Sequence, residues 1–333
     1  MVSMKDIARR CGVSVATVSK ALNGLPDIGE ETRQRICAVA AEMGYMTNSA
    51  ARALKTKRTY NLGILFVDER RSGLSHEYFS SIIEGFKQEA EAHGYDITFI
   101  NSNVGTQPIS YLRHCRYRGL DGVLIACVNF HDPRVEELVQ SNIPVVTIDH
   151  IFPNRQAILS DNVDGLEALV RYAYGKGHRR IAFLHGEDTS VTKGRLTGFY
   201  KACRELGLEI PEEYVRPCVY HDPACCEKQT RELLKLPERP TCIIFPDDYS
   251  FMGGYNALAE AGLRLAEDIS ALGYDGINLA QLMHLTTYTQ NAATIGRTSA
   301  QRLIALVEDP QSLCLDPILI HGGLLEGTTV KEL

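Results

Sequence analysis

Basic side chains that could neutralise phosphate groups are concentrated at the start of the sequence. Residues 1–60 contain ten Lys and Arg side chains against five Asp and Glu, whereas the remaining 273 residues contain 25 basic and 36 acidic side chains. The two parts carry formal charges of +5 and −11, which the overall charge of −6 conceals. A basic segment on an acidic remainder is typical of a polyanion-binding module joined to a second domain, with a solvated charged face as the alternative.

The rest of the sequence lacks the residue patterns of most catalytic and metal-binding sites. It contains no Cys-x-x-Cys pair, no P-loop and no glycine-rich dinucleotide motif after the first predicted strand. The carboxylates of Asp247, Asp248 and Asp275 could mimic the paired carboxylates of a glycosidase, but no His or Cys cluster supports metal or acyl chemistry. We therefore expect no enzymatic activity, no metal and no cofactor. The ten cysteines are interpreted as reduced thiols, and the adjacent Cys225 and Cys226 as packing residues, with redox chemistry as the alternative.

The N-terminal sequence and the distribution of apolar residues argue against export and against a membrane span. The first residues, MVSMKDIARRCGVS, carry charges at positions 5, 6, 9 and 10 and lack the apolar core of a signal peptide. No run of about 18 apolar residues is present, which is the length that crosses a bilayer. The 333 residues, 44% of them hydrophobic, suffice for roughly two to three domains. We expect a cytoplasmic protein with no membrane partner.

Three short helices are predicted at the N-terminus, over residues 4–11, 15–23 and 30–43. Ser3 and Asp6 have the spacing of a capping box before the first helix. Gly12 permits a tight turn before the second helix, which Ser14 can cap, and Gly44 ends the third. Two helices joined by a Gly-containing turn are typical of a helix-turn-helix, whose second helix places its first residues over base edges in the major groove of DNA.

From residue 61, short apolar runs alternate with amphipathic stretches. The first predicted strands are 62–67, 96–100, 122–127 and 144–149, and the helices between them are 77–93, 108–118 and 132–140. The pattern repeats from a strand at 157–160, with strands at 180–186, 214–220, 241–246 and 269–275 and helices at 163–176, 195–206, 223–235 and 250–261. A helix at 292–308 and a strand at 317–321 return to the first lobe. The fold class is α/β, with two doubly wound parallel-sheet lobes that form a ligand cleft between them.

These segments resemble the LacI/GalR family of bacterial transcription regulators. The resemblance is carried by KDIARRCGVSVATVSKALNG, GEETRQRICAVAAEMGY and NSAARALKTKRT near the N-terminus, and later by SDNVDG, GHRRIAFLHG, RLTGF, PDDYSFMGG, GYDGI and LTTYTQN. It implies an all-α helix-turn-helix head on a type I periplasmic-binding-protein-like body. The implied domains are a DNA-binding head at 1–47, a hinge helix or linker at 48–60, and an effector-binding and dimerisation domain at 61–333. Its first lobe would span about 61–159 and 292–319, and its second about 160–291 and 320–333.

The same resemblance implies which residues contact DNA. In the head they are Val15, Ala16, Thr17, Ser19, Lys20 and Asn23. Lys20 could donate to guanine O6 or N7, whereas Val15 and Ala16 offer only apolar contact, for example to a thymine methyl group. Thr17 and Ser19 would hold phosphates or cap the helix. Plain helix surface is the alternative for Val15 and Ala16.

A hinge that orders on DNA is implied for the segment after the head. Leu54 matches the family's leucine that wedges into the minor groove at the operator centre, an insertion that costs a few kcal/mol of unstacking. Arg52 and Lys55 flank it and could contact phosphates or the groove floor. A flexible linker is the alternative, because the segment has too little apolar surface to fold alone.

The resemblance also implies an effector site between the lobes. Its residues are Tyr78, Phe79, Asp149, Arg195, Tyr220, Asp247, Asp275 and Gln290. A guanidinium and a carboxylate such as Arg195 and Asp275 can fix adjacent hydroxyl groups by charge-assisted hydrogen bonds, and the aromatic rings can stack on a sugar face. For Asp247 the alternative is a helix cap, and for the aromatic residues it is core packing.

The expected protein is a repressor of carbohydrate-metabolism genes. We expect it to bind pseudo-palindromic operator DNA as a homodimer, with a tetramer as the alternative, and to respond to a small sugar or sugar derivative. The alternative function is that of a transport-type sugar-binding protein, which would share the body but not the basic head.

Overall fold

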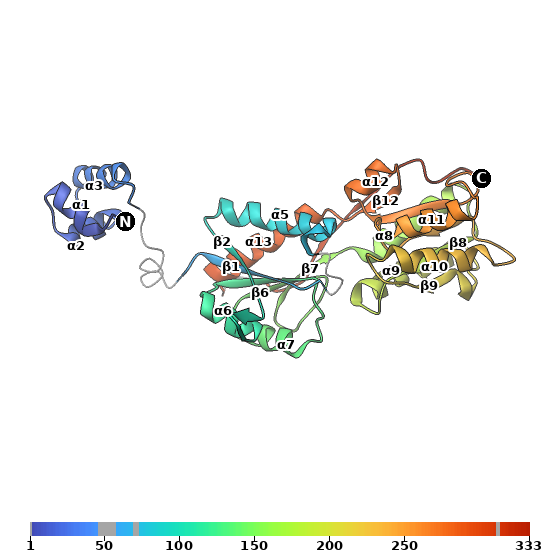
Figure 1. The fold of residues 1–333 in the computed structure, drawn as a ribbon, viewed down its shortest axis with the longest axis horizontal. Coiled ribbons are helices and arrows are strands. Elements are labelled where there is room, and N and C mark those ends of the chain that lie inside the picture. The colour runs from blue at the N-terminus through green and yellow to red at the C-terminus, as the bar shows by residue number, and fades with distance from the viewer. Residues whose placement is uncertain (1, 46–57, 69–72, 311–313) are drawn as a thin grey trace. The chain divides into compact units, whose positions relative to one another are not determined.

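The computed structural model describes residues 2–45, 58–68, 73–310 and 314–333. They form two compact units, Met1–Thr59 and Tyr60–Leu333, which are described separately below (Figure 1). Arg52, Leu54 and Lys55, predicted as hinge contacts, lie outside the described residues. Within the described ranges no helix has the length and apolarity needed to cross a membrane.

The head consists of three helices around a small core. They are α1 (Met4–Cys11), α2 (Val15–Leu22) and α3 (Glu30–Glu42), within one residue of the predicted ranges. The backbone N–H of Ser3 donates to Oδ2 of Asp6 at 3.0 Å, as the capping box requires. Gly12 adopts a left-handed φ of 66° at the end of α1, which permits the sharp turn into α2. The buried residues are Ile7, Ala8, Val18, Ala21, Ile36 and Ala40.

The first lobe of the body is a parallel sheet with helices on both faces. Its strand order is β13-β7-β6-β5-β1-β2, and every neighbouring pair is parallel. The strands are β1 (Asn61–Phe66), β2 (Asp96–Phe99), β5 (Gly122–Ala126), β6 (Val145–Ile148), β7 (Gln156–Ser160) and β13 (Ile318–Ile320). The helices are α5 (Glu77–Ala92), α6 (Tyr111–Arg118), α7 (Pro133–Val139) and α13 (Ala292–Glu308). Figure 1 shows α5 and α13 on one face of the sheet and α6 and α7 on the other.

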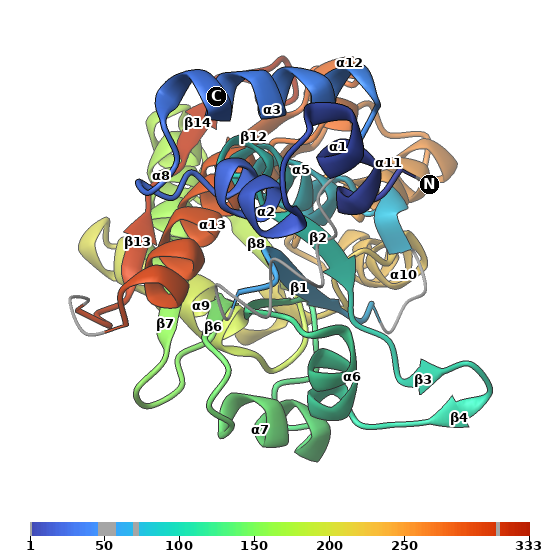
Figure 2. The ribbon, with the colours of Figure 1, turned by 90° about the vertical axis from the view of Figure 1, so that its left-hand side faces the viewer.

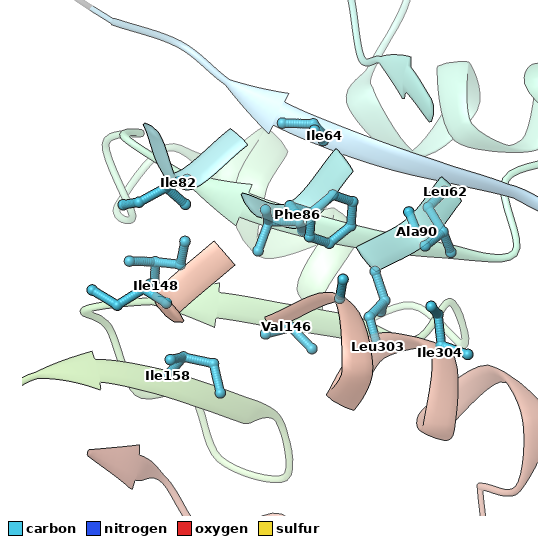
Figure 3. Packing of buried hydrophobic residues seen from close by; sticks show 14 of the residues in the cluster. Leu62, Ile64, Ile82, Phe86, Ala90, Val146, Ile148, Ile158, Leu303 and Ile304 are labelled. Carbon is cyan, nitrogen blue, oxygen red and sulfur yellow. The ribbon is translucent and has the colours of Figure 1, made fainter. Parts of the chain in front are cut away.

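Helices α5 and α13 pack together on one face of this sheet. This packing positions the start of α5, which carries Tyr78 and Phe79. Figure 3 shows apolar side chains of both helices and of the central strands filling one continuous layer, including Phe86, Leu303 and Val146. The strand residues Leu62, Ile64 and Ile158 are fully buried there. Strands with apolar residues on both faces need helices on both faces of the sheet. The layer formed by α5 and α13 supplies one of these covers, as the doubly wound arrangement predicted from the sequence requires.

The second lobe repeats the arrangement with one antiparallel edge strand. Its order is β14-β12-β11-β10-β8-β9, and only the β12–β14 pair is antiparallel. The strands are β8 (Ile181–His185), β9 (Val215–Pro217), β10 (Cys242–Ile244), β11 (Ser270–Asp275), β12 (Thr286–Thr289) and β14 (Gly323–Leu325). The helices are α8 (Asn162–Gly175), α9 (Ser190–Glu205), α10 (Pro223–Leu234), α11 (Phe251–Glu260) and α12 (Asn278–Leu282).

Several elements differ from the sequence prediction. The strand predicted at 157–160 to open the second lobe is β7, which pairs in the first sheet with β6 and β13. Helix α9 begins at Ser190 rather than 195, because Thr189 caps it by accepting the N–H of Thr192. A hairpin of β3 (Asn103–Val104) and β4 (Gln107–Pro108) precedes α6 and projects from the first lobe in Figure 2. It delays the start of α6, predicted at 108, to Tyr111.

Within the described residues the chain passes between the two sheets at three places. It leaves the first sheet after β7 (Ser160), returns after β12 through Gln290 and Asn291, and crosses again between β13 and β14. Polar residues at these crossings lie between the carboxyl ends of strands from both sheets, where α/β folds bind ligands.

Two glycines allow α5 and α13 to approach closely. A Cβ at Gly296 would lie 2.0 Å from the carbonyl oxygen of Ile82, and one at Gly85 would lie 2.3 Å from that of Ala293. Because these neighbours are backbone atoms, we expect Gly296→Ala to lower the free energy of unfolding by about 1–3 kcal/mol. Gly175→Ala, where a Cβ meets nothing within 4 Å, is the matched control and should not destabilise the protein. Urea unfolding measures both, and equal midpoints would contradict the tight approach.

Candidate functional site

The first residues of α2 present the predicted base-reading surface of the head. Ser14 caps the helix: its Oγ accepts the backbone N–H of Thr17 at 3.1 Å and lies 2.8 Å from the Thr17 hydroxyl. The cap leaves Val15, which is 40% exposed, and Ala16 on the outside of the helix. Both side chains are therefore available for apolar contact with a base edge.

Lys20 lies in the last turn of α2 and Asn23 is the C-cap of that helix, and both have partners within the head. The ammonium group of Lys20 is 2.5 Å from Oδ2 of Asp27, and this hydrogen bond lowers the pKa of Asp27. Both side chains are about half exposed, so the ion pair contributes little and can be exchanged for a contact to DNA. Asn23 donates from Nδ2 to the carbonyl oxygen of Ser19 at 2.5 Å.

In the body, Arg195 is held by acceptors and rings on several sides. This α9 side chain is only 3% exposed. Its Nε donates to Oδ1 of Asn162 at 2.9 Å, and Nη1 donates to the carbonyl oxygen of Pro246 at 2.6 Å. The guanidinium carbon lies 3.6 Å from the ring centroid of Tyr274 and 5.2 Å from that of Tyr220. Such a guanidinium is pre-oriented, because few of its rotamers satisfy all of these contacts.

Asp275 lies beside Arg195 at the end of β11. Its Oδ1 is 3.9 Å from Nη2 of Arg195 and accepts a hydrogen bond from Nε2 of Gln290 at 2.5 Å. Its backbone has a φ of 109°, which is rare for a residue with a side chain and indicates that the surroundings impose this geometry. Burial raises the pKa of Asp275 well above its ordinary value, and the charge of Arg195 opposes that shift.

Tyr78, Asp149 and Gln290 extend this arrangement into the first lobe. Asp149 accepts the backbone N–H of Ser160 at 2.6 Å and the hydroxyl of Ser160 at 3.0 Å. The Ser160 hydroxyl is 3.2 Å from that of Tyr78, which in turn donates to Oε1 of Gln290 at 3.5 Å. Since Gln290 also donates to Asp275, one polar network joins the two lobes through the crossing segments. The structure therefore brings together five predicted residues from distant parts of the sequence: Tyr78, Asp149, Arg195, Asp275 and Gln290.

The other predicted aromatic residues differ in their surroundings. Tyr220 lies against the Arg195 guanidinium, and its hydroxyl is 2.9 Å from that of Thr192. Phe79 instead packs within the first lobe, with ring centroids 5.7 Å from Phe66 and 4.9 Å from His76. Tyr220 is therefore placed with the charged pair, whereas Phe79 packs at the edge of the core.

The carboxylates of Asp247 and Asp248 accept hydrogen bonds from backbone N–H groups within the second lobe. Asp247 accepts the N–H of His221 at 2.8 Å, and the N–H and hydroxyl of Ser250, each at 2.7 Å. Asp248 accepts the N–H groups of Gly276 and Ile277 at 2.7 and 3.0 Å. Both carboxylates thus fix the loops around the Arg195 site by binding backbone donors.

Sequence reasoning missed residues that hold the lobes together. A stack of rings crosses from one lobe to the other: the His76 and His221 centroids are 4.2 Å apart, and those of His221 and Tyr249 are 4.1 Å apart. Burial and the neighbouring His221 lower the pKa of His76 to about 4, so the ring is neutral when stacked. Asn162 was also missed, although it lies within the string SDNVDG. Its amide orients the Arg195 guanidinium, but no regular sequence spacing relates the two residues.

Two further hydrogen bonds join the lobes directly. The Ser190 hydroxyl donates to the carbonyl oxygen of Asp149 at 2.7 Å, and the N–H of Asn278 donates to Oε1 of Glu77 at 2.7 Å. They connect the starts of α9 and α12 in one lobe to β6 and α5 in the other. The lobes are therefore in contact around the polar network.

One group of side chains has the composition of a metal site. Donor atoms of Asp161, Asp164 and His321 lie within 4.8 Å of one another. Asp161 also caps α8, accepting the N–H of Asp164 at 3.0 Å, and its other oxygen is 2.9 Å from Nδ1 of His321. A helix cap with an ion-pair partner accounts for this arrangement.

Comparison with known proteins agrees with this architecture. Residues 61–316 match the family described as periplasmic binding proteins and sugar binding domain of LacI family, and residues 3–48 match the bacterial regulatory proteins, lacI family. The chain is 30% identical over 333 residues to the HTH-type transcriptional repressor PurR of Escherichia coli O139:H28, an alignment that covers 96% of each chain.

Solved structures share the whole fold. The lac repressor dimer bound to operator and the anti-inducer ONPF superposes with a TM-score of 0.80 at 25% identity, covering 99% of both chains. The complex of the transcriptional regulator CelR with cellobiose has the same fold, with a TM-score of 0.71 at 20% identity over 99% of this chain and 100% of that one. The body match covers most of the chain and the PurR alignment covers nearly all of it, so this protein belongs to the LacI family of bacterial regulatory proteins.

Proposed function

We propose that this protein is a cytoplasmic repressor that binds operator DNA through its head and a small sugar or sugar derivative between the lobes of its body. The observation that carries the proposal is the polar network from Asp149 to Arg195, which joins both lobes around a buried and pre-oriented guanidinium. Its role is binding rather than catalysis, because a network with satisfied partners orients groups without activating a nucleophile. The regulated genes would belong to carbohydrate metabolism.

The head, residues 1–47, would read the operator with the surface of α2. Exposed Val15 and Ala16 would contact base edges. Lys20 would give up its ion pair with Asp27 and donate a hydrogen bond to guanine. The side chains that would face phosphates are Thr17, Ser19 and Asn23. The hinge, 48–60, would add Arg52, Leu54 and Lys55 at the operator centre. The lac repressor binds its operator as a dimer, and a homodimer of this chain, or a tetramer made of two such dimers, would place two heads on each pseudo-palindrome.

The effector would bind among the residues predicted for this site. Arg195 and Asp275 are suited to fixing adjacent hydroxyl groups, and Tyr220 offers a ring face beside them. Tyr78, Asp149 and Gln290 would contribute from the first lobe and the crossing, Asp247 would hold the loop of His221, and Phe79 would close the edge. The CelR structure contains cellobiose, which supports a sugar as the ligand class.

Coupling between the two ligands would pass through the contacts that join the lobes. An effector that hydrogen-bonds to Arg195 and Asp275 competes with Gln290 and changes how the lobes meet. The first lobe carries β1, which follows the hinge, so we infer that its position would favour or disfavour an ordered hinge on DNA. Linkage then requires that effector and operator change each other's affinity by the same factor.

A thermal-shift screen tests the proposal. The full chain is heated with monosaccharides, disaccharides including cellobiose, sugar phosphates and nucleobases, because a ligand of the folded state raises the melting temperature by mass action. We expect a sugar to stabilise the protein and to change its affinity for a palindromic DNA fragment. Stabilisation by a nucleobase alone would contradict the sugar assignment, and a DNA affinity unaffected by every stabilising ligand would contradict the coupling.

Lys20 provides a direct test of base reading. We expect Lys20→Ala to weaken binding to the preferred operator by about 1–3 kcal/mol and to relax the preference at one base pair in each half-site. Lys201→Ala, which removes a surface ion pair with Glu167 in the body, is the control and should leave DNA binding unchanged. Selection from a randomised DNA pool measures both variants. An equal loss of affinity for all sequences would assign Lys20 to phosphate contact instead.

A further inference from the structure

Three cysteine thiols meet at the start of α10. Cys218 follows β9, and Cys225 and Cys226 lie in the first turns of α10. The thiol of Cys218 is in hydrogen-bonding contact with those of Cys226 and Cys225. Cys218 and Cys226 are buried in the same hydrophobic cluster, and Cys225 packs against it with partial exposure. Two thiols already in contact need little backbone movement to form a disulfide.

The backbone holds these thiols in place from both sides. The N–H of Cys218 donates to the carbonyl oxygen of His185 at 2.7 Å, which fixes it to the end of β8. Asp222 caps α10: its Oδ1 accepts the N–H of Cys225 at 3.1 Å, and its carbonyl oxygen accepts that of Cys226 at 3.3 Å. The contact is therefore set by a strand end and a capped helix rather than by a loose loop.

Cys218 differs from Cys203 and Cys225 in the direction of its pKa shift. Hydrogen bonding from Cys226 lowers the pKa of Cys218 despite the opposing effect of burial. Burial alone raises the pKa of Cys203 to about 12, and the pKa of Cys225 is raised to about 11. Since the thiolate is the nucleophile in thiol oxidation, the lowered pKa favours Cys218 as the attacking thiol.

The segment between the cysteines carries part of the candidate effector site. Tyr220, whose ring faces Arg195, and His221, which donates its N–H to Asp247, both lie between Cys218 and Cys225. A covalent bond from Cys218 to α10 would close a short loop around these two residues and reduce its freedom to move.

We propose that Cys218 and Cys226 form a reversible disulfide when the protein meets hydrogen peroxide. The Cys218 thiolate attacks one peroxide oxygen, the O–O bond breaks, and the departing hydroxide takes a proton and leaves as water. The Cys226 sulfur then attacks the sulfenic acid sulfur of Cys218, and the second oxygen leaves as water. The two thiols lose two electrons and two protons in all, and the peroxide is reduced to two water molecules. A dithiol reductant reverses the reaction by thiol–disulfide exchange.

Peptide mapping of the full chain tests the pairing. The reduced protein is treated with a small excess of hydrogen peroxide, its remaining thiols are alkylated, and the monomer is recovered from a non-reducing gel, because Cys37 and Cys314 are exposed and could join two chains. A protease that cuts before Asp222 separates Cys218 from the other two. We expect two peptides linked by a disulfide that dithiothreitol releases. A single peptide from Asp222 onward, lighter by two hydrogen atoms, would show a disulfide among Cys225, Cys226 and Cys242 and overturn the proposal, as would unlinked peptides.

Single variants identify the partner of Cys218. We expect Cys226→Ser to reduce the linked pair at least tenfold, whereas Cys225→Ser, the adjacent matched control, should retain it. The reverse result would overturn the assignment to Cys226. Cys218→Ser should also slow the consumption of peroxide by the protein, and Cys203→Ser should not, since burial keeps that thiol protonated. An unchanged rate in Cys218→Ser would contradict its role as the nucleophile.

Discussion

Replacing Arg195 with Ala is expected to abolish the response to effector while leaving operator binding intact. The change removes the cation beside Asp275 and the donor to Asn162, and it leaves a cavity beneath Tyr220. Truncating one partner of a buried, hydrogen-bonded charged group costs about 2–5 kcal/mol of binding free energy, which corresponds to at least a thirtyfold loss of affinity. In the thermal-shift assay, the stabilising sugar should no longer raise the melting temperature of the variant.

Two further variants separate the binding role from a general loss of stability. Arg171→Ala removes an exposed arginine that pairs with Glu167 and should leave the effector response unchanged. Arg195→Lys keeps the positive charge but loses the fork that reaches Asn162 and Pro246 together, and we expect it to bind effector weakly while folding normally. Full effector binding by either Arg195 variant would remove this residue from the site.

The head was predictable from the sequence because its determinants are local. Ser3, Ser14 and the glycines at positions 12 and 44 act within one turn of the helices that they begin or end. The apolar stripes of three short helices have only one another to pack against. For this reason the predicted and observed bounds agree within one residue.

The assignment of strands to sheets was less predictable, because the sequence of a strand does not determine which other strands it pairs with. The run at 157–160 is buried on both faces and would suit either lobe, and only its pairing with β6 and β13 places it in the first. Helix α9 was predicted to start at 195, but it begins at Ser190, although the Ser, Val, Thr and Gly residues between 190 and 194 favour helix only weakly. The Thr189 cap overrides that weakness.

The resemblance identified the charged residues of the candidate site and Gln290, but it did not identify the other neutral residues that orient them. Ser160, Thr192 and Asn162 have no spacing that marks them, yet each makes a hydrogen bond to a predicted residue. Their partners come from strands and helices far apart in the sequence. The contacts therefore depend on how the two sheets meet, a property of the whole body.

Asp248 should give the stability of this protein an unusual dependence on pH. It is fully buried beside Gly276 and Thr287, and burial raises its pKa from 3.8 to about 7, although the hydrogen bonds from Thr287, Ile277 and Gly276 oppose the shift. Between about pH 4 and pH 7 the unfolded chain loses a proton that the folded chain keeps. The contribution of Asp248 to the free energy of unfolding therefore falls as pH rises, by about 4 kcal/mol across this window.

The comparison of variants isolates this contribution. Buried His76, with a pKa of about 4, acts in the opposite direction, because the unfolded chain binds a proton there that the folded chain excludes. We therefore compare the free energies of unfolding of the wild type and Asp248→Asn in urea from pH 4 to pH 7.5. As pH rises, the free energy of unfolding of the wild type should fall relative to that of Asp248→Asn. Asp268→Asn is the control: its carboxylate is exposed and its pKa is lowered, so its effect lies below this window. Parallel stability curves for the wild type and Asp248→Asn would mean that the three donors keep Asp248 ionised throughout.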